Sequence, residues 1–229
     1  MDFETRPLAT GPDTTFTASR IRTAVQDLLG LEGLPPIVQA GHPVLRQRAA
    51  PYDGQLDDTE LAQLIERMRD VMHAAPGVGL AAPQLGIPLQ LAVLEDHFDV
   101  DPIASEIRER TPLAFFAILN PSYEPEGTST ASFYEGCLSV RGFQAVVTRH
   151  RNVRLEYQRP DGSAASAGYS GWQARIVQHE TDHLHGGLYL DRAELRSLAN
   201  DGEYSANWAY PGIDEARLGL GFLDSEPSP

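Results

Sequence analysis

The feature that most constrains this chain is an HExxH motif, HETDH at residues 179–183. Residues four positions apart share one face of an α-helix, so the imidazoles of His179 and His183 can reach the same metal ion. Glu180 lies beside the first of them, where a carboxylate can exchange a proton with metal-bound water. Apolar residues at helical spacing and a Gly-Gly stop predict a helix over residues 171–185. The motif therefore predicts a mononuclear metal site on that helix.

Two histidines do not complete a catalytic metal site, which usually has three protein ligands and one open position. Cys137, the only cysteine, follows Gly136 at the mouth of a predicted strand, and a thiolate binds zinc or ferrous iron tightly. Glu203 is a weaker candidate, because its turn-like segment offers no helix to project it. A cysteine nucleophile activated by His179 is a further alternative, but it leaves the paired histidines unexplained. We therefore expect Cys137 to be the third ligand.

The lone cysteine also bears on the cellular compartment, since one thiol cannot form an internal disulfide and suits a reducing environment. Residues 1–30 carry acids and threonines instead of the apolar core of a signal peptide. The longest apolar run covers residues 113–119, far too short to span a membrane. With 32 acidic and 18 basic residues the net charge is −14, which disfavours a general nucleic-acid binder. We expect a cytoplasmic protein that binds neither a membrane nor nucleic acid directly.

Composition divides the chain into three parts. Residues 1–35 form an N-terminal extension, which is loose over residues 1–15 and has a short helix predicted over residues 19–29 from its single apolar face. A Leu-Pro-Pro sequence then opens the main metallohydrolase domain, which we place at residues 36–200. Residues 201–229 form an acidic C-terminal tail, with six acids against one arginine and otherwise small or turn-forming residues.

The periodicity of the main domain predicts an α+β fold. Residues 58–74 keep a 3.6-residue apolar period behind an Asp-Asp cap signal, and they form the strongest predicted helix. Short apolar runs at 89–95 and 113–119 indicate strands, and residues 144–158 predict two more. We expect small mixed or antiparallel β-sheets packed around the central HExxH-bearing helix, together with N-terminal helices.

Three stretches of the chain together resemble one known family. They are GVGLAAPQ at residues 77–84, EGCLSV at 135–140 and QHETDHLHG at 178–186. In this order they are similar to the three signature motifs of peptide deformylase of the bacterial type. The combination is highly specific, and the wider match covers residues 36–200. All basic residues are arginines, which is typical of a GC-rich genome.

The resemblance implies a metal hydrolase that removes the formyl group from the N-terminal formyl-methionine of nascent chains and releases formate. By position, Cys137, His179 and His183 match the metal ligands of the family, and Glu180 matches its general acid/base. The family commonly uses one ferrous ion per chain, and the sequence leaves zinc, nickel and cobalt open. The implied partners are formyl-methionyl nascent peptides and, transiently, the ribosome.

The resemblance also assigns residues around the metal. Gln84 and the backbone N–H of Leu138 match the donors that polarise the formyl oxygen. Gly79 and Glu135 fall where the family lines its substrate groove, and Val78 falls in its methionine pocket.

Two positions depart from the family pattern. Arg141 stands where the family usually has proline, and Gln144 replaces an arginine that helps to hold the peptide in many members. We expect an effect on peptide binding beyond the methionine, for which Arg141 could compensate in part. Some members dock on the ribosome through a basic C-terminal helix, and the acidic tail predicts that this chain does not.

Two other functions remain open at this point. A zincin-type endopeptidase would require Glu203 in place of Cys137 as the third ligand. A non-catalytic paralogue that only binds formylated peptides would have no need of a proton shuttle, so Glu180 and Gln84 argue against it.

Overall fold

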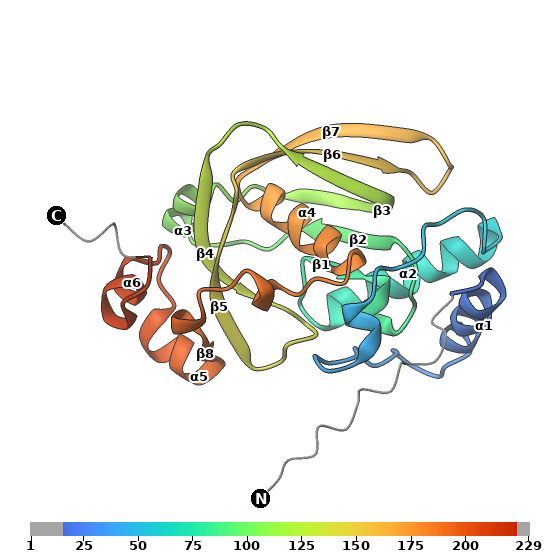
Figure 1. Cartoon of the computed structure of the whole chain (residues 1–229), viewed down its shortest axis with the longest axis horizontal. Helices are drawn as coiled ribbons and strands as arrows, with labels where there is room; N and C mark the ends of the chain where they lie inside the picture. Colours follow the sequence, from blue (N-terminus) through green and yellow to red (C-terminus); the bar gives the residue numbers. More distant parts are fainter. Residues whose placement is uncertain (1–15, 224–229) are drawn as a thin grey trace, which may run out of the picture.

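The computed structural model describes residues 16–223 as a succession of helices and antiparallel strands (Figure 1). The strands are β1 (Gly79–Ala81), β2 (Leu91–Asp96), β3 (Leu113–Pro125), β4 (Thr130–Gly136), β5 (Phe143–His150), β6 (Asn152–Gln158), β7 (Ala164–Ser170) and β8 (Ala199–Asn200). The α-helices are α1 (Ala18–Leu29), α2 (Asp58–Ala74), α3 (Pro102–Arg108), α4 (Gly171–Leu184), α5 (Asp201–Glu203) and α6 (Asp214–Leu220). The other short helical segments are η1 (Pro43–Arg46), η2 (Ala82–Leu85), η3 (Tyr189–Asp191), η4 (Leu195–Ser197) and η5 (Tyr204–Trp208).

The loose extension expected over residues 1–15, and the end of the tail at 224–229, lie outside the described residues. Between residues 16 and 223, none of the helices is long and apolar enough to cross a membrane.

Within the described residues the strands form two antiparallel sheets. One has the order β1-β2-β3-β6-β7, and the other has the order β4-β5-β8. Helix α4 lies at the centre of the molecule and contacts strands of both sheets (Figure 1). The expected α+β class with antiparallel sheets is confirmed.

Both faces of the five-stranded sheet are covered by helices, as β2 illustrates. Leu91 and Val93 belong to the apolar cluster that includes α1 and α2, whereas Ala92 and Leu94 belong to the cluster that includes α4. Because successive side chains of a strand point to opposite faces, a strand buried on both sides is a continuous apolar run. This explains the pattern seen in the sequence at residues 89–95.

Helix α4 confirms the predicted HExxH helix. It begins at Gly171, where φ is +56° and a Cβ would lie 2.5 Å from the carbonyl oxygen of Glu109, so a glycine is required. Gly186, with φ of +82°, reverses the chain just after the helix. The helix buries Ala174, Arg175, Ile176, Val177, Gln178, Glu180, Thr181, His183 and Leu184. Burial on most of its faces holds the motif rigidly between the two sheets.

The two N-terminal helices were also predicted with accurate bounds. Helix α2 starts with a capping box, in which Asp57 accepts hydrogen bonds from the backbone of Thr59 and Glu60 and the Glu60 carboxylate returns to the Asp57 N–H. Helix α1 buries Ile21 and Val25 in the same apolar cluster as α2. The helix expected within residues 1–35 therefore packs into the same core as α2.

The C-terminal segment is more ordered than its composition indicated. Residues 201–220 form α5, η5 and α6, and Ala216 and Phe222 are buried against the three-stranded sheet. Tyr204 packs edge-on against Tyr134 of β4, with ring centroids 5.0 Å apart. Short helices with few apolar positions produce little periodic signal, so the sequence pattern did not predict them.

Candidate functional site

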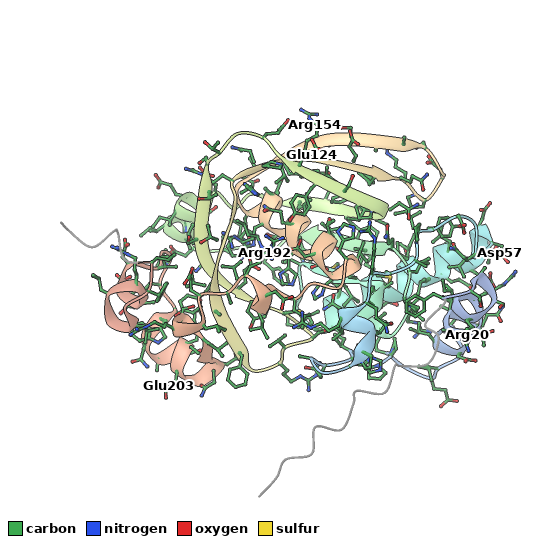
Figure 2. All side chains as sticks on the ribbon, viewed as in Figure 1. Arg20, Asp57, Glu124, Arg154, Arg192 and Glu203 are labelled. Atoms are coloured by element: carbon green, nitrogen blue, oxygen red, sulfur yellow. The ribbon has the colours of Figure 1, made fainter. Side chains whose placement is uncertain are left out.

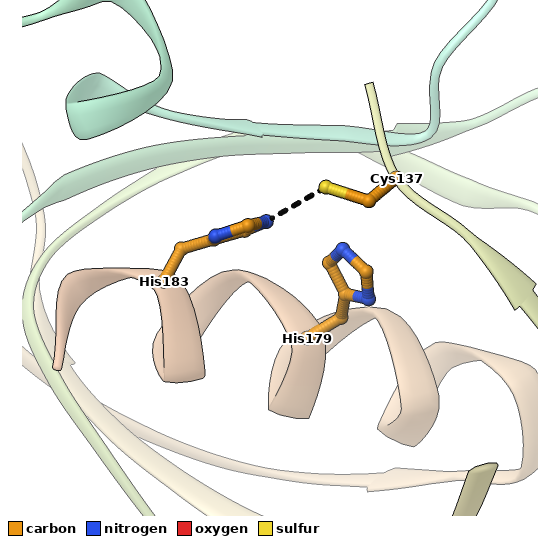
Figure 3. Close-up of side chains that lie close together, drawn as sticks. All are labelled: Cys137, His179 and His183. Carbon is orange, nitrogen blue, oxygen red and sulfur yellow. Dashed lines mark hydrogen bonds between the residues drawn. The ribbon is translucent and has the colours of Figure 1, made fainter. Parts of the chain in front are cut away.

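The structure brings together the three ligands expected from the sequence. His179 and His183 lie one turn apart on α4, and Cys137 follows the end of β4 directly above them (Figure 3). One ligand atom from each side chain lies within 4.8 Å of the other two, and Cys137 Sγ is 3.2 Å from His183 Nε2. A thiol and two imidazoles that converge in this way form a donor set suited to one divalent ion.

Backbone geometry and polar donors hold the cysteine in place. Strand β4 ends at Gly136, and the chain turns so that the Val140 N–H donates to the Cys137 carbonyl at 2.9 Å. The N–H of Ser139 lies 3.4 Å from the sulfur, and Gln84 Nε2 lies 3.6 Å from it. These donors fix the position of the sulfur above the two histidines.

Glu135 orients the first histidine. His179 Nδ1 donates to Glu135 Oε2 at 3.0 Å, which leaves Nε2 to face the ligand cluster. The same carboxylate receives Arg149 at 2.7 Å and Arg175 at 2.5 Å. Burial alone would raise the pKa of Glu135, but Arg149, His179 and Arg175 hold it well below its usual range. Glu135 lines the cavity, as expected, but its carboxylate faces His179 and the two arginines.

The two histidines differ in their electrostatic surroundings. Burial holds the pKa of His183 well below 6.5, which keeps its imidazole neutral and able to act as a ligand. Burial also opposes the charged form of His179, but the Cys137 sulfur and the Glu135 carboxylate outweigh it and raise the pKa of His179 well above 6.5. Without metal, the site therefore favours the charged form of His179 and the neutral form of His183.

Glu180 lies in the cavity wall with one free carboxylate oxygen. It is 4% exposed, and its Oε2 has no hydrogen-bond partner among the described residues. Burial raises the pKa of Glu180 to about 7. Its carboxylate packs directly on Gly79, where a Cβ would lie 2.5 Å from Glu180 Cδ. A carboxyl that is unpaired and titrates near neutral pH is suited to proton transfer.

Two expected donors lie at the same end of the cavity. The side-chain oxygen of Gln84 accepts a bond from the Ala81 N–H at 2.8 Å, which directs its NH₂ group toward Cys137 and Ser139. The N–H of Leu138 makes no hydrogen bond to any other described residue, while its carbonyl accepts one from Gln39 at 3.0 Å. The Leu138 N–H is thus unbonded and available to a ligand, whereas the Gln84 NH₂ group donates to Cys137 and Ser139.

The residues singled out from the sequence surround one cavity of about 620 Å³. Its lining includes Val78, Gly79, Gln84, Glu135, Cys137, Leu138, Arg141, Gln144, His179 and Glu180. The structure adds lining residues that sequence motifs did not reveal: Arg108, Arg110, Asp201 and Tyr204. Asp201 and Tyr204 come from the segment expected to be a tail, and only the fold brings them to the cavity.

The alternative ligand Glu203 does not reach this site. It is exposed on the C-terminal helices, away from α4 (Figure 2), and its carboxylate accepts a bond from Asn207 at 3.0 Å. Among the described residues, the group that contains both motif histidines is completed by Cys137. The ligand set required for a zincin-type endopeptidase is therefore not formed.

Comparison with known sequences places this chain beside one family. The family model for polypeptide deformylase matches residues 34–198. Peptide deformylase 3 of Streptomyces avermitilis is 51% identical over 213 residues, which cover 93% of this chain and 95% of the relative. Peptide deformylase 1 of Streptomyces coelicolor is 52% identical over 198 residues, which cover 86% and 91%.

Solved structures show the same fold. The crystal structure of a class I type b peptide deformylase from Acinetobacter baumannii bound to Met-Ala-Ser superposes with a TM-score of 0.63 and 29% identity, covering 71% of this chain and 99% of that one. Family match, high identity over most of the chain, shared fold and converging ligands all lead to one conclusion: this chain belongs to the polypeptide deformylase family.

Proposed function

We propose that this chain removes the formyl group from N-terminal formyl-methionine and releases formate, using a metal ion held by Cys137, His179 and His183. The observation that carries the proposal is the convergence of Cys137 with both histidines of the HETDH motif beside a cavity. Such an ion would supply Lewis acidity. It would lower the pKa of water, so that a nucleophile able to attack a carbonyl is available near neutral pH.

Glu180 is the proposed proton carrier. Its unpaired oxygen borders the cavity, and its pKa of about 7 allows it to accept a proton from the attacking water and to deliver it to the leaving amine. Gly79 supports this role, because the absence of a side chain there leaves room for the carboxylate.

Gln84 and Leu138 are proposed to stabilise the oxyanion that forms on the formyl oxygen. The Gln84 NH₂ group donates to Cys137 Sγ, and the Leu138 N–H belongs to the residue next to Cys137 in the cavity lining. Donors fixed before the reaction act without reorganisation, and the loss of one typically costs about 3 to 4 kcal/mol of transition-state stabilisation.

The substrate side chains are assigned by position along the cavity. Val78, half-buried beside Gly79, is proposed to contact the methionine side chain. Arg141 and Gln144 lie farther along the wall, and Gln144 is bonded to Asp201 at 3.4 Å. Arg141 is therefore the free cation best placed to hold the peptide beyond the methionine.

Ferrous iron is the proposed native metal, with zinc, nickel and cobalt as ions that the same donors can hold. One thiolate and two imidazoles suit several divalent ions of the first transition row, so availability in the cell decides among them. A reducing cytoplasm is the proposed location, because oxidation of Cys137 would remove a ligand.

Nascent formyl-methionyl chains are the proposed partners, met during transient contact with the ribosome. The C-terminal segment bears several acids and one arginine, Arg217, which argues against docking through a basic helix. The same acidity argues against direct nucleic-acid binding.

Anaerobic purification tests the proposal, with metal analysis and formate release from formyl-Met-Ala-Ser measured on one sample. We expect one tightly held divalent ion per chain and release of formate that stops after chelation. Cys137→Ala should lose both the ion and the activity, whereas Glu203→Ala should keep both. Turnover that survives in Cys137→Ala would refute the assigned ligand set.

A further inference from the structure

A second group of side chains with metal-ligand chemistry lies outside the catalytic cavity. His73, Glu95 and His97 each place one ligand atom within 4.8 Å of the other two. His73 Nε2 is 2.5 Å from Glu95 Oε2, and the two imidazole rings meet edge to face with centroids 5.5 Å apart. None of the three residues lines the catalytic cavity.

The carboxylate of this group is held in a fixed orientation. Glu95 lies in β2, its side chain is 13% exposed, and its backbone N–H donates to the Val78 carbonyl at 3.0 Å. Arg69, one turn before His73 on α2, donates to the other carboxylate oxygen at 3.3 Å. With one oxygen held by Arg69, the other oxygen of the carboxylate faces His73.

We propose that His73, Glu95 and His97 form a second binding site for a divalent transition metal, with Zn²⁺ as the ion that best suits the donors. Two imidazoles and one carboxylate are a ligand set that holds zinc with a position left for water. Both histidines are exposed, so an ion reaches them from solvent. Arg69 acts on the far oxygen of Glu95, as outer partners commonly orient carboxylate ligands.

The position of this group connects it to the cavity wall. His73 lies just before residues 75–78, all of which line the cavity. Glu95 holds the far end of that segment through its bond to Val78. An ion shared by His73, Glu95 and His97 ties the end of α2 to the end of β2, and so restrains the segment from both ends.

Equilibrium dialysis against Co²⁺ tests the site on enzyme whose catalytic site is already loaded with Co²⁺, because cobalt reports its ligands by absorption. We expect about two ions per chain, of which only one produces a thiolate charge-transfer band, since the second set holds nitrogen and oxygen alone. His97→Ala should lower the affinity for the second ion more than about a hundredfold. Loss of a residue that only orients a ligand costs up to about a hundredfold, and His97 is proposed as a ligand itself. The thiolate band and formate release should be unchanged in this variant.

Two further variants make the result decisive. His73→Ala should lose the second ion in the same way, whereas His42→Ala, an exposed histidine outside both ligand groups, should keep it. Binding of a single ion by the wild type, or retention of the second ion by both His73→Ala and His97→Ala, overturns the proposal. Because the thiolate band follows the catalytic ion separately, failure of either site is recognised independently.

Zn²⁺ provides a second readout that does not depend on activity. Zn²⁺ is added to enzyme whose catalytic site is already filled. It should slow amide hydrogen exchange in residues 74–79 of the wild type, and it should not change the exchange of these residues in His97→Ala. Equal amide exchange with and without Zn²⁺ in the wild type would overturn the proposal that the second ion restrains the cavity wall.

Discussion

His179 donates its Nδ1–H to Glu135 at 3.0 Å, so the orientation of a proposed metal ligand on α4 is set by a carboxylate on β4. Arg149 and Arg175 bind the same carboxylate, and each of these four side chains is at most 12% exposed. The central helix and the three-stranded sheet are therefore joined at the reacting centre by an ion network. Such outer partners fix the tautomer of a ligating histidine and increase its affinity for metal.

Replacing Glu135 tests this relationship. We expect Glu135→Gln to lower metal affinity about 10- to 100-fold. It should also lower the free energy of unfolding by about 3 kcal/mol, because buried Arg175 loses its carboxylate partner and buried Arg149 keeps only Asp182. Metal competition with a chelator and urea unfolding measure the two effects. Glu124→Gln, on the exposed part of β3 (Figure 2), is the matched control and should change neither. Unchanged metal affinity in Glu135→Gln would contradict the positioning role.

Glu180→Gln separates proton transfer from metal binding. The amide keeps the shape of the side chain but carries no transferable proton, so turnover should fall about 10²- to 10⁴-fold. Metal content should stay at the wild-type level, since Glu180 is not one of the converging ligands. Formate release and metal analysis are measured on the same preparation. Undiminished hydrolysis would remove Glu180 from the mechanism.

Gly79→Ala tests the close approach of β1 to the carboxylate. A methyl group at this position overlaps the Glu180 carboxylate, which must move away from the cavity. We expect kcat to fall about a hundredfold, because a displacement of a catalytic group by about 1 Å can lower the rate by this factor. Gly212→Ala is the control, because a Cβ there meets no atom within 4 Å. Full activity in Gly79→Ala would show that the position of Glu180 is not critical.

Arg141→Ala addresses peptide binding beyond the methionine. Arg141 lines the cavity, and only its backbone N–H is bonded, to Gln39 at 3.2 Å, among the contacts of the described residues. We expect KM for formylated tripeptides to rise about tenfold with little change in kcat, the pattern of a lost uniform binding contact. Steady-state kinetics with formyl-Met-Ala-Ser measure it, and an unchanged KM contradicts the assignment.

The raised pKa of Glu180 predicts a pH dependence of stability in the metal-free protein. Because its pKa is about 7 when folded and 4.5 as a free group, Glu180 binds its proton more tightly in the folded state. Its contribution to the free energy of unfolding is therefore complete below about pH 4.5 and is lost as the pH rises through about 7. After chelation, Glu180→Gln should gain stability relative to the wild type over this interval. Urea unfolding at several pH values measures the difference, and a constant difference argues against the raised pKa.

Local patterns were sufficient for the main helices and for the metal ligands. The apolar period of residues 58–74 and its cap signal identified α2, and the i, i+4 histidines identified the working face of α4. Cys137 could be paired with them because a thiolate suits the third ligand position and because EGCLSV resembles a family motif. The helices and the paired histidines depend on neighbours within one or two turns, which a sequence displays directly.

Contacts between distant segments required the tertiary structure. The sequence did not indicate that Glu135 faces His179, that Asp201 and Tyr204 border the cavity, or that His73 meets Glu95 and His97. The sequence by itself determined the three longest helices, the motif and the chemistry of the candidate ligands, because the helices and the motif depend on short-range spacing. Only the fold decided which charged groups surround that chemistry, because strand register and the packing of α4 between two sheets bring together residues that share no local pattern.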